Sequence, residues 1–129
     1  MAGETILIVD DNETNLRLLR MLLLRRGYDV HTAAGGEEAR ARVRAVRPAM
    51  VLMDLQLPEV DGLQLTREIK ADPELRETIV VAVTSYAMKG DREKALAAGC
   101  DGYVTKPIDT RALPQEIAQR LEKRAAHAG

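Results

Sequence analysis

The sequence contains no phenylalanine and no tryptophan, and its three tyrosines are its only aromatic residues. Proteins that hold single-stranded nucleic acids stack the bases on aromatic rings, so a stacking platform is not expected here. The net charge of −1 also gives no support for a surface that neutralises a phosphate backbone. Nucleic acid is therefore not an expected partner.

Cysteine and long apolar runs are also scarce. The single cysteine, Cys100, excludes an internal disulfide, and there is no Cys/His cluster for zinc. No apolar run approaches the roughly 20 residues of a membrane span, and the N-terminus lacks the pattern of a secretory signal. These absences predict a cytoplasmic protein that does not contact a membrane. The 129 residues suit one domain, with its core at about 5–123 and a short tail at 124–129.

Short apolar runs alternate with longer segments of helical periodicity. Strands are expected at residues 5–10, 28–33, 50–54, 78–84 and 101–106, with helices between them and after the last one. Asn12 is a candidate N-cap, and Leu113, Ile117 and Leu121 mark one buried stripe of the last helix. Pro114 lacks a backbone donor, so this helix either begins near Leu113 or has a distorted first turn. The alternation predicts a three-layer α/β fold with a parallel sheet.

The composition of the expected strands indicates their order in the sheet. The strands at 5–10, 50–54 and 78–84 are almost entirely aliphatic, as central strands buried on both faces are. The strands at 28–33 and 101–106 include polar residues, as edge strands do. This favours the flavodoxin-like (βα)5 order 2-1-3-4-5 over the dinucleotide-binding order 3-2-1-4-5, which places the third strand at an edge.

Three carboxylates stand at the ends of two strands that this order makes neighbours. Asp10 and Asp11 end the first strand, and Asp54 ends the third. The carboxyl ends of such strands flank the crevice where open α/β sheets bind ligands. At roughly 5 Å and an effective dielectric constant near 20, each like-charge pair costs about 3 kcal/mol, so a cation is expected. A few hard oxygens with room for water favour Mg²⁺ over Ca²⁺ or Zn²⁺.

Two further polar residues stand on the same rim, Thr84 at the end of the fourth strand and Lys106 at the end of the fifth. A hydroxyl group and an ammonium beside a metal and carboxylates describe a site for a phosphoryl group. Three aspartates, Mg²⁺ and Lys106 sum to zero charge, so the site tolerates the added charge of a phosphoryl group. Asp54 is the expected acceptor, because a carboxylate can act as a nucleophile and form an aspartyl-phosphate.

Four motifs in this order, IVDDNE, VLMDLQLPEVDG, VTS and YVTKP, resemble the receiver domains of two-component response regulators. The resemblance covers about residues 5–123. It implies that Asp11 and Asp54 ligate Mg²⁺ directly and that Asp10 acts largely through water. It also implies that the backbone carbonyl of Gln56 completes the protein ligands.

The resemblance implies further roles around the metal. Thr84 and Lys106 contact the phosphoryl group, and the Lys106–Pro107 peptide is cis. Tyr103 matches the switch aromatic that turns inward as Thr84 moves. The donor is a phosphohistidine on a histidine kinase or a histidine phosphotransfer protein. An output partner docks on the face made by the fourth helix, the fifth strand and the last helix. Tyr86, two residues past Thr84, is expected to shield the aspartyl-phosphate from water.

The length and the DDNETN stretch are similar to single-domain receivers of the DivK type, and also to receivers carried by hybrid kinases. The leading expectation is a stand-alone phospho-acceptor switch, without an output domain, that acts in trans by docking. It is not expected to be an enzyme beyond catalysing its own phosphorylation and slow dephosphorylation. A phosphate sink and a detached hybrid-kinase receiver stay open.

Two other function classes fit less well. DDNET is faintly similar to the nucleophile loop of haloacid-dehalogenase-like phosphatases, with Asp10 attacking. However, Asn12 stands where that family needs a second acid, and the chain has no room for a cap domain. A flavodoxin-like FMN carrier needs a loop rich in Ser, Thr and Gly after the first strand, and the acidic loop here repels a phosphate.

Overall fold

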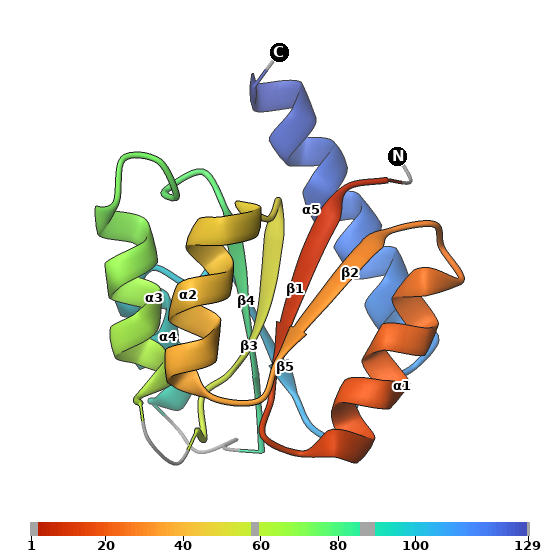
Figure 1. Ribbon diagram of the computed structural model, residues 1–129, viewed down its shortest axis with the longest axis horizontal. Helices are drawn as coiled ribbons and strands as arrows, with labels where there is room; N and C mark the ends of the chain where they lie inside the picture. The colour runs from red at the N-terminus through yellow and green to blue at the C-terminus, as the bar shows by residue number, and fades with distance from the viewer. Residues whose placement is uncertain (1–2, 58–59, 86–89, 129) are drawn as a thin grey trace.

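The computed structural model describes residues 3–57, 60–85 and 90–128, which form five strands and five helices in alternation (Figure 1). The strands are β1 (Thr5–Val9), β2 (Asp29–Ala33), β3 (Met50–Asp54), β4 (Ile79–Thr84) and β5 (Gly102–Thr105). The helices are α1 (Glu13–Leu24), α2 (Gly36–Val46), α3 (Gly62–Ala71), α4 (Asp91–Ala98) and α5 (Ala112–Ala128). Among the described helices, none is both long and apolar enough to cross a membrane.

The strands form one parallel sheet in the order β2-β1-β3-β4-β5, which confirms the predicted fold and strand order. The central strands β3 and β4 are buried at every residue, whereas the edge strands β2 and β5 include partly exposed positions. In register, Asp54 at the end of β3 lies beside Val83 of β4, and Val9 of β1 lies beside Met53. The carboxyl ends of β1, β3, β4 and β5 therefore meet along one edge of the sheet.

The sheet divides the apolar core into two layers, because successive side chains of a strand point to opposite faces. In β1, for example, Leu7 and Val9 belong to one layer, and Ile6 and Ile8 belong to the other. The first layer also includes buried residues of α2, α3 and α4, and the second includes buried residues of α1 and α5. Figure 1 shows the same division, with α2, α3 and α4 on one side of the sheet and α1 and α5 on the other.

Polar side chains cap the starts of α1 and α5. Asn12 caps α1, since its side-chain oxygen accepts a hydrogen bond from the Asn15 N–H at 3.0 Å. Asp109 accepts from the N–H groups of Arg111 and Ala112 in a turn just before α5. Pro114 then lies in the first turn of α5. Backbone N–H groups in a first turn have no acceptor within the helix, so the missing N–H of proline costs no helical hydrogen bond there. Of the two alternatives for this helix, the structure shows a start near Leu113.

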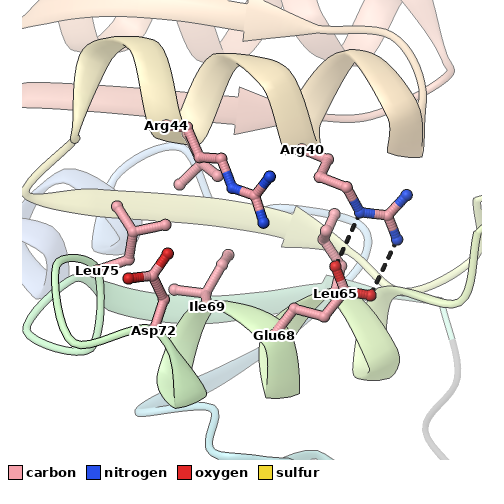
Figure 2. A pocket seen from close by; sticks show the side chains of 8 residues that line it. Arg40, Arg44, Leu65, Glu68, Ile69, Asp72 and Leu75 are labelled. Carbon is pink, nitrogen blue, oxygen red and sulfur yellow. Dashed lines mark hydrogen bonds and ion pairs between the residues drawn. The ribbon is translucent and has the colours of Figure 1, made fainter.

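The helices α2 and α3 are joined by a charged pair across their shared groove. Arg40 Nε and Nη2 donate to the two carboxylate oxygens of Glu68 at 2.8 and 2.9 Å (Figure 2). This paired geometry is the favoured one between a guanidinium and a carboxylate. The Arg40 guanidinium holds the pKa of the Glu68 carboxyl below its ordinary value. The pair therefore fixes the spacing of two helices on the same face of the sheet.

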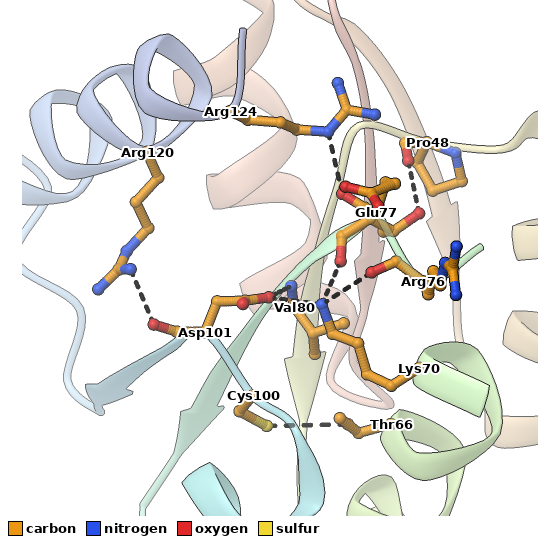
Figure 3. Close-up of polar contacts among 11 residues, drawn as sticks. Pro48, Thr66, Lys70, Arg76, Glu77, Val80, Cys100, Asp101, Arg120 and Arg124 are labelled. Carbon is orange, nitrogen blue, oxygen red and sulfur yellow. Dashed lines mark hydrogen bonds and ion pairs between the residues drawn. The ribbon is translucent and has the colours of Figure 1, made fainter. Parts of the chain in front are cut away.

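Lys70 joins three elements at the opposite end of the sheet from the carboxyl edge. Its ammonium donates to the Thr78 carbonyl at 2.7 Å, to Asp101 Oδ2 at 2.8 Å and to the Arg76 carbonyl at 3.4 Å (Figure 3). Asp101 Oδ2 also accepts from the Val80 N–H at 2.8 Å. Lys70 lies in α3, and its partners lie just before or at the start of β4 and β5. This network holds the amino ends of those strands against α3.

Candidate phosphorylation site

Three aspartates meet at the carboxyl edge of the sheet. Asp10, Asp11 and Asp54 each offer a carboxylate oxygen, and these oxygens all lie within 4.8 Å of one another. They meet because β1 and β3 are adjacent parallel strands that end at the same level. Asp10 and Asp54 are each only 2% exposed, whereas Asp11 is exposed. The cluster therefore combines two buried carboxylates with one that faces solvent.

Asp10 is held by two donors at the start of α1. Its Oδ1 accepts from the Asn12 N–H at 2.8 Å, and its Oδ2 accepts from the Asn15 side-chain amide at 3.3 Å. Asn15 was not singled out from the sequence. The sequence did contain a sign of this contact. Asn15 lies five residues after Asp10, in the first turn of the helix that the Asn12 cap predicts. The carboxylate is thus fixed in place from the α1 side.

Asp54 is as deeply buried as Asp10. Its Oδ1 accepts from the Gln56 N–H at 2.9 Å. Burial is the largest influence on its carboxyl and raises the pKa above the ordinary value of 3.8, although the Gln56 hydrogen bond and the Lys106 charge oppose this. The neighbouring carboxylates of Asp10 and Asp11 raise the pKa further. Even with the Lys106 charge nearby, the ionised form of Asp54 is therefore less favoured in the folded protein than in the unfolded chain.

Lys106 supplies positive charge to both buried carboxylates. Its ammonium lies 3.2 Å from Asp10 Oδ2 and 3.5 Å from Asp54 Oδ2, and its side chain is 17% exposed. Its backbone N–H donates to the Thr84 carbonyl at 2.8 Å, which fixes the residue to the end of β4. The Lys106–Pro107 peptide is cis, as the family resemblance implied.

Thr84 and Gln56 occupy the rim between β3 and β4. Thr84 is the last residue of β4 and is fully buried. The family resemblance implied only a backbone role for Gln56. Its side chain also makes a contact, since Oε1 accepts from the Ser85 N–H at 3.0 Å. Local sequence gives no sign of this contact, because it joins two loops 29 residues apart. Tyr86 lies outside the described residues.

Tyr103 lies on β5 and lines a cleft that also includes Leu55, the residue after Asp54. The tyrosine is half-buried and packs against the core layer of α2, α3 and α4. Burial raises the pKa of its hydroxyl, and the charges of Asp91 and Glu93 add to that effect. The cleft has a volume of about 200 Å³ and is lined by Leu55, Asp61, Leu63, Asp91, Lys94 and Tyr103. The structure thus places the expected switch aromatic next to the start of α4.

The donor set of the site fits a small divalent cation. Three carboxylates face one ammonium among the described residues, so the cluster retains negative charge. The available ligand atoms are hard oxygens, which Mg²⁺ and Ca²⁺ prefer, and include neither nitrogen nor sulfur. One carboxylate of the three is open to solvent, so water can complete a coordination shell.

Comparison with curated proteins shows close relatives. The polar-differentiation response regulator DivK of Brucella anthropi is 47% identical over 118 residues, which cover 92% of this chain and 96% of that protein. DivK of Brucella ovis is 46% identical over the same span.

Solved structures show the same fold. A CheY-like response regulator receiver domain from Methanospirillum hungatei has a TM-score of 0.91 and 28% identity, covering 98% of this chain and 99% of that one. The receiver domain of a sensor histidine kinase from Pseudomonas aeruginosa has a TM-score of 0.82 and 39% identity, covering 93% and 98%. That structure holds a magnesium ion in its active-site cleft.

These relatives are response regulators and receiver domains, which are signalling proteins rather than classical enzymes. The model of the response regulator receiver domain matches residues 6–118, a span that includes the aspartates, Thr84, Tyr103 and Lys106. The match runs through all five strands and the first turns of α5. Together with the DivK relatives, it shows that this chain belongs to the response regulator receiver domain family.

Proposed function

We propose that this protein is a phospho-acceptor switch in a two-component phosphorelay. Asp54 takes a phosphoryl group from a phosphohistidine on a histidine kinase or a histidine phosphotransfer protein. One observation carries the proposal: a buried aspartate at a strand end lies 3.5 Å from an ammonium and within a cluster of two further carboxylates. A carboxylate in such a position can act as a nucleophile while neighbouring charge stabilises the group being transferred.

Mg²⁺ is the proposed cofactor of the site. Asp11, Asp54 and the backbone carbonyl of Gln56 would hold it, with Asp10 acting through water. When bound, Mg²⁺ supplies positive charge that offsets the carboxylates and the transferring phosphoryl group. The donor set of hard oxygens supports this choice, as does the magnesium ion in the Pseudomonas aeruginosa receiver.

The two oxygens of Asp54 are not equivalent in the structure. Oδ1 accepts the Gln56 N–H, and Oδ2 faces the Lys106 ammonium. In the proposed transfer, a carboxylate oxygen forms a bond to phosphorus while the bond from phosphorus to the donor imidazole nitrogen breaks. The electron pair of that bond stays with the imidazole. Lys106 then neutralises a phosphoryl oxygen, and the Thr84 hydroxyl donates to another.

The output of the switch is proposed to be delivered in trans, through a protein that docks on α4, β5 and α5. In this proposal Tyr103 turns inward as Thr84 moves toward the phosphoryl group. The cleft beside Tyr103 supports the first movement, since it offers space next to the ring. Leu96 of α4 is 45% exposed and offers an apolar side chain to such a partner. The match over 96% of the length of the DivK relatives supports a function of the same kind for this chain.

Intact mass spectrometry tests this proposal. The wild type, incubated with Mg²⁺ and acetyl phosphate, should gain one phosphoryl group. Asp54→Asn and a sample with EDTA should gain none. The phosphorylation proposal would be rejected by the absence of an adduct on the wild type, together with unchanged Thr84 and Lys106 resonances after addition of beryllofluoride and Mg²⁺.

A further inference from the structure

Gln56 connects the phospho-acceptor strand to the neighbouring strand through two separate hydrogen bonds. Its backbone N–H donates to Asp54 Oδ1 at 2.9 Å, and its side-chain Oε1 accepts from the Ser85 N–H at 3.0 Å. The first bond lies within the loop after β3, and the second crosses to the residue that follows β4. One residue therefore contacts both the acceptor carboxylate and the strand end that carries Thr84.

The Ser85 N–H lies on the same rim of the sheet as the Asp54 carboxylate, since both are bonded to Gln56. Ser85 comes two residues after Val83, which is the register partner of Asp54. A phosphoryl group on Asp54 adds charged oxygens to this rim, and an N–H bonds a charged oxygen more strongly than a neutral amide oxygen. Thr84 and Ser85 also share a rigid peptide plane, so a shift of the Thr84 carbonyl carries the Ser85 N–H with it.

On the basis of the proposed function, we infer that the Gln56 side chain is a positioning residue of the phosphorylation site. In the unphosphorylated protein it holds the Ser85 N–H and with it the end of β4. Phosphorylation of Asp54 exchanges this bond for one from Ser85 to a phosphoryl oxygen. The Gln56 side chain therefore stabilises the unphosphorylated arrangement and weakens the affinity of the site for a phosphoryl group.

The substitution Gln56→Met separates this side-chain bond from the backbone roles of the residue. Methionine has a similar length and shape but no amide oxygen, while the backbone N–H to Asp54 and the backbone carbonyl remain. Removal of one net hydrogen bond from the unphosphorylated arrangement should raise the affinity for a phosphoryl analogue about three- to fivefold. Gln119→Met is the matched control, because Gln119 is exposed on α5.

Two measurements test the inference, using beryllofluoride with Mg²⁺ as the phosphoryl analogue. In the protein without Mg²⁺ or analogue, the Ser85 amide proton should shift upfield and exchange faster in Gln56→Met than in the wild type or Gln119→Met. In a titration, Gln56→Met should bind beryllofluoride three- to fivefold more tightly than the other two proteins.

The possible failures can be told apart. An unchanged Ser85 amide resonance in Gln56→Met would show that the bond does not form in solution and would overturn the inference. A shifted resonance with equal or weaker beryllofluoride affinity would overturn the coupling to phosphorylation. If the wild type bound no beryllofluoride and accepted no phosphoryl group, the proposed function itself would be wrong, and the inference would be rejected with it.

Discussion

The Lys106 ammonium lies 3.2 Å from Asp10 Oδ2, although the two residues belong to strand ends that are not adjacent in the sheet. Lys106 comes just after the edge strand β5 and Asp10 just after β1, with β4 and β3 between them. The Lys106 N–H bonds the Thr84 carbonyl at the end of β4, so the side chain starts beside β4 and points along the carboxyl edge of the sheet toward Asp10. The contact ties the two ends of the site together, and the same ammonium also approaches Asp54.

Replacement of this ammonium should affect stability and metal binding in opposite directions. Lys106→Met leaves Asp10 and Asp54 buried without their shared cation, so the Mg²⁺-free protein should lose about 2 kcal/mol of unfolding free energy. Mg²⁺ should bind several-fold more tightly, because no ammonium competes for the same carboxylates. Urea denaturation and calorimetric Mg²⁺ titration measure the two effects. A variant as stable as the wild type in EDTA would contradict the first.

The raised pKa of Asp54 predicts a pH-dependent gain in stability from Asp54→Asn. Folded Asp54 binds its proton more tightly than the unfolded chain does, so its ionisation destabilises the fold as the pH rises through the folded pKa. In EDTA at pH 7, Asn should therefore stabilise the protein by on the order of 1 kcal/mol. The gain should vanish below the ordinary pKa of 3.8, where Asp54 is neutral in both states. Urea unfolding at both pH values checks this. A pH-independent difference would argue against it.

Asp11 should contribute to metal affinity without contributing much to the fold, because its side chain is exposed. Asp11→Asn is expected to weaken Mg²⁺ binding at least tenfold and to change the stability of the metal-free protein by less than about 0.5 kcal/mol. Glu122→Gln, on the exposed surface of α5, removes the same charge elsewhere and should leave Mg²⁺ affinity unchanged. Calorimetric titration of the three proteins decides the matter. Equal weakening in both variants would point to net charge alone.

Gly62 allows the start of α3 to pack directly on the end of β3. A Cβ there would lie 2.8 Å from the Asp54 carbonyl oxygen and 2.9 Å from Leu55 Cα. Because both are backbone atoms, Gly62→Ala should destabilise the protein by about 1–3 kcal/mol, despite the better helix propensity of alanine. At Gly35 a Cβ meets nothing within 4 Å, so Gly35→Ala should cost about 1 kcal/mol at most. Thermal denaturation of both variants gives the comparison, and equal losses would refute the packing explanation.

Lys70 should contribute to stability through its three acceptors. Lys70→Met keeps the aliphatic stem but leaves the Thr78 carbonyl and part of the Asp101 carboxylate without their donor. We expect a loss of about 2 kcal/mol and faster amide exchange at Val80, whose N–H bonds the same carboxylate oxygen. Lys94→Met, at an exposed position of α4, is the control and should change neither. Unaltered exchange at Val80 would exclude a role for Lys70 in holding Asp101.

Most of the fold could be predicted because strand burial leaves a clear mark on sequence. Both ends of the strand Met50–Asp54 were predicted correctly. The polar residues of β2 and β5 correctly identified these two as the edge strands of the sheet. The Lys70 network could not be predicted. Its partner Asp101 lies 31 residues away, and a lysine in a helix has the same local pattern whether its ammonium meets water or a carboxylate.

The site also contains residues that could be predicted from the sequence and residues that could not. The positions of Asp10, Asp11, Asp54, Thr84 and Lys106 could be predicted because each stands at a strand end, and the strand order brings those ends together. The side-chain contacts of Asn15 and Gln56 depend on rotamers and on the path of two loops. Periodicity carries no information about either. Residues placed by topology were therefore predictable, and residues placed by loop geometry were not.

The division of the helices between the two faces of the sheet also has a consequence for the proposed docking surface. Because α4 and α5 belong to opposite core layers, a surface made from both must pass over the open edge of β5. An edge strand presents unpaired backbone groups that can template pairing with another chain. A partner bound to both helices would therefore cover these backbone groups, and the protein without that partner would expose them.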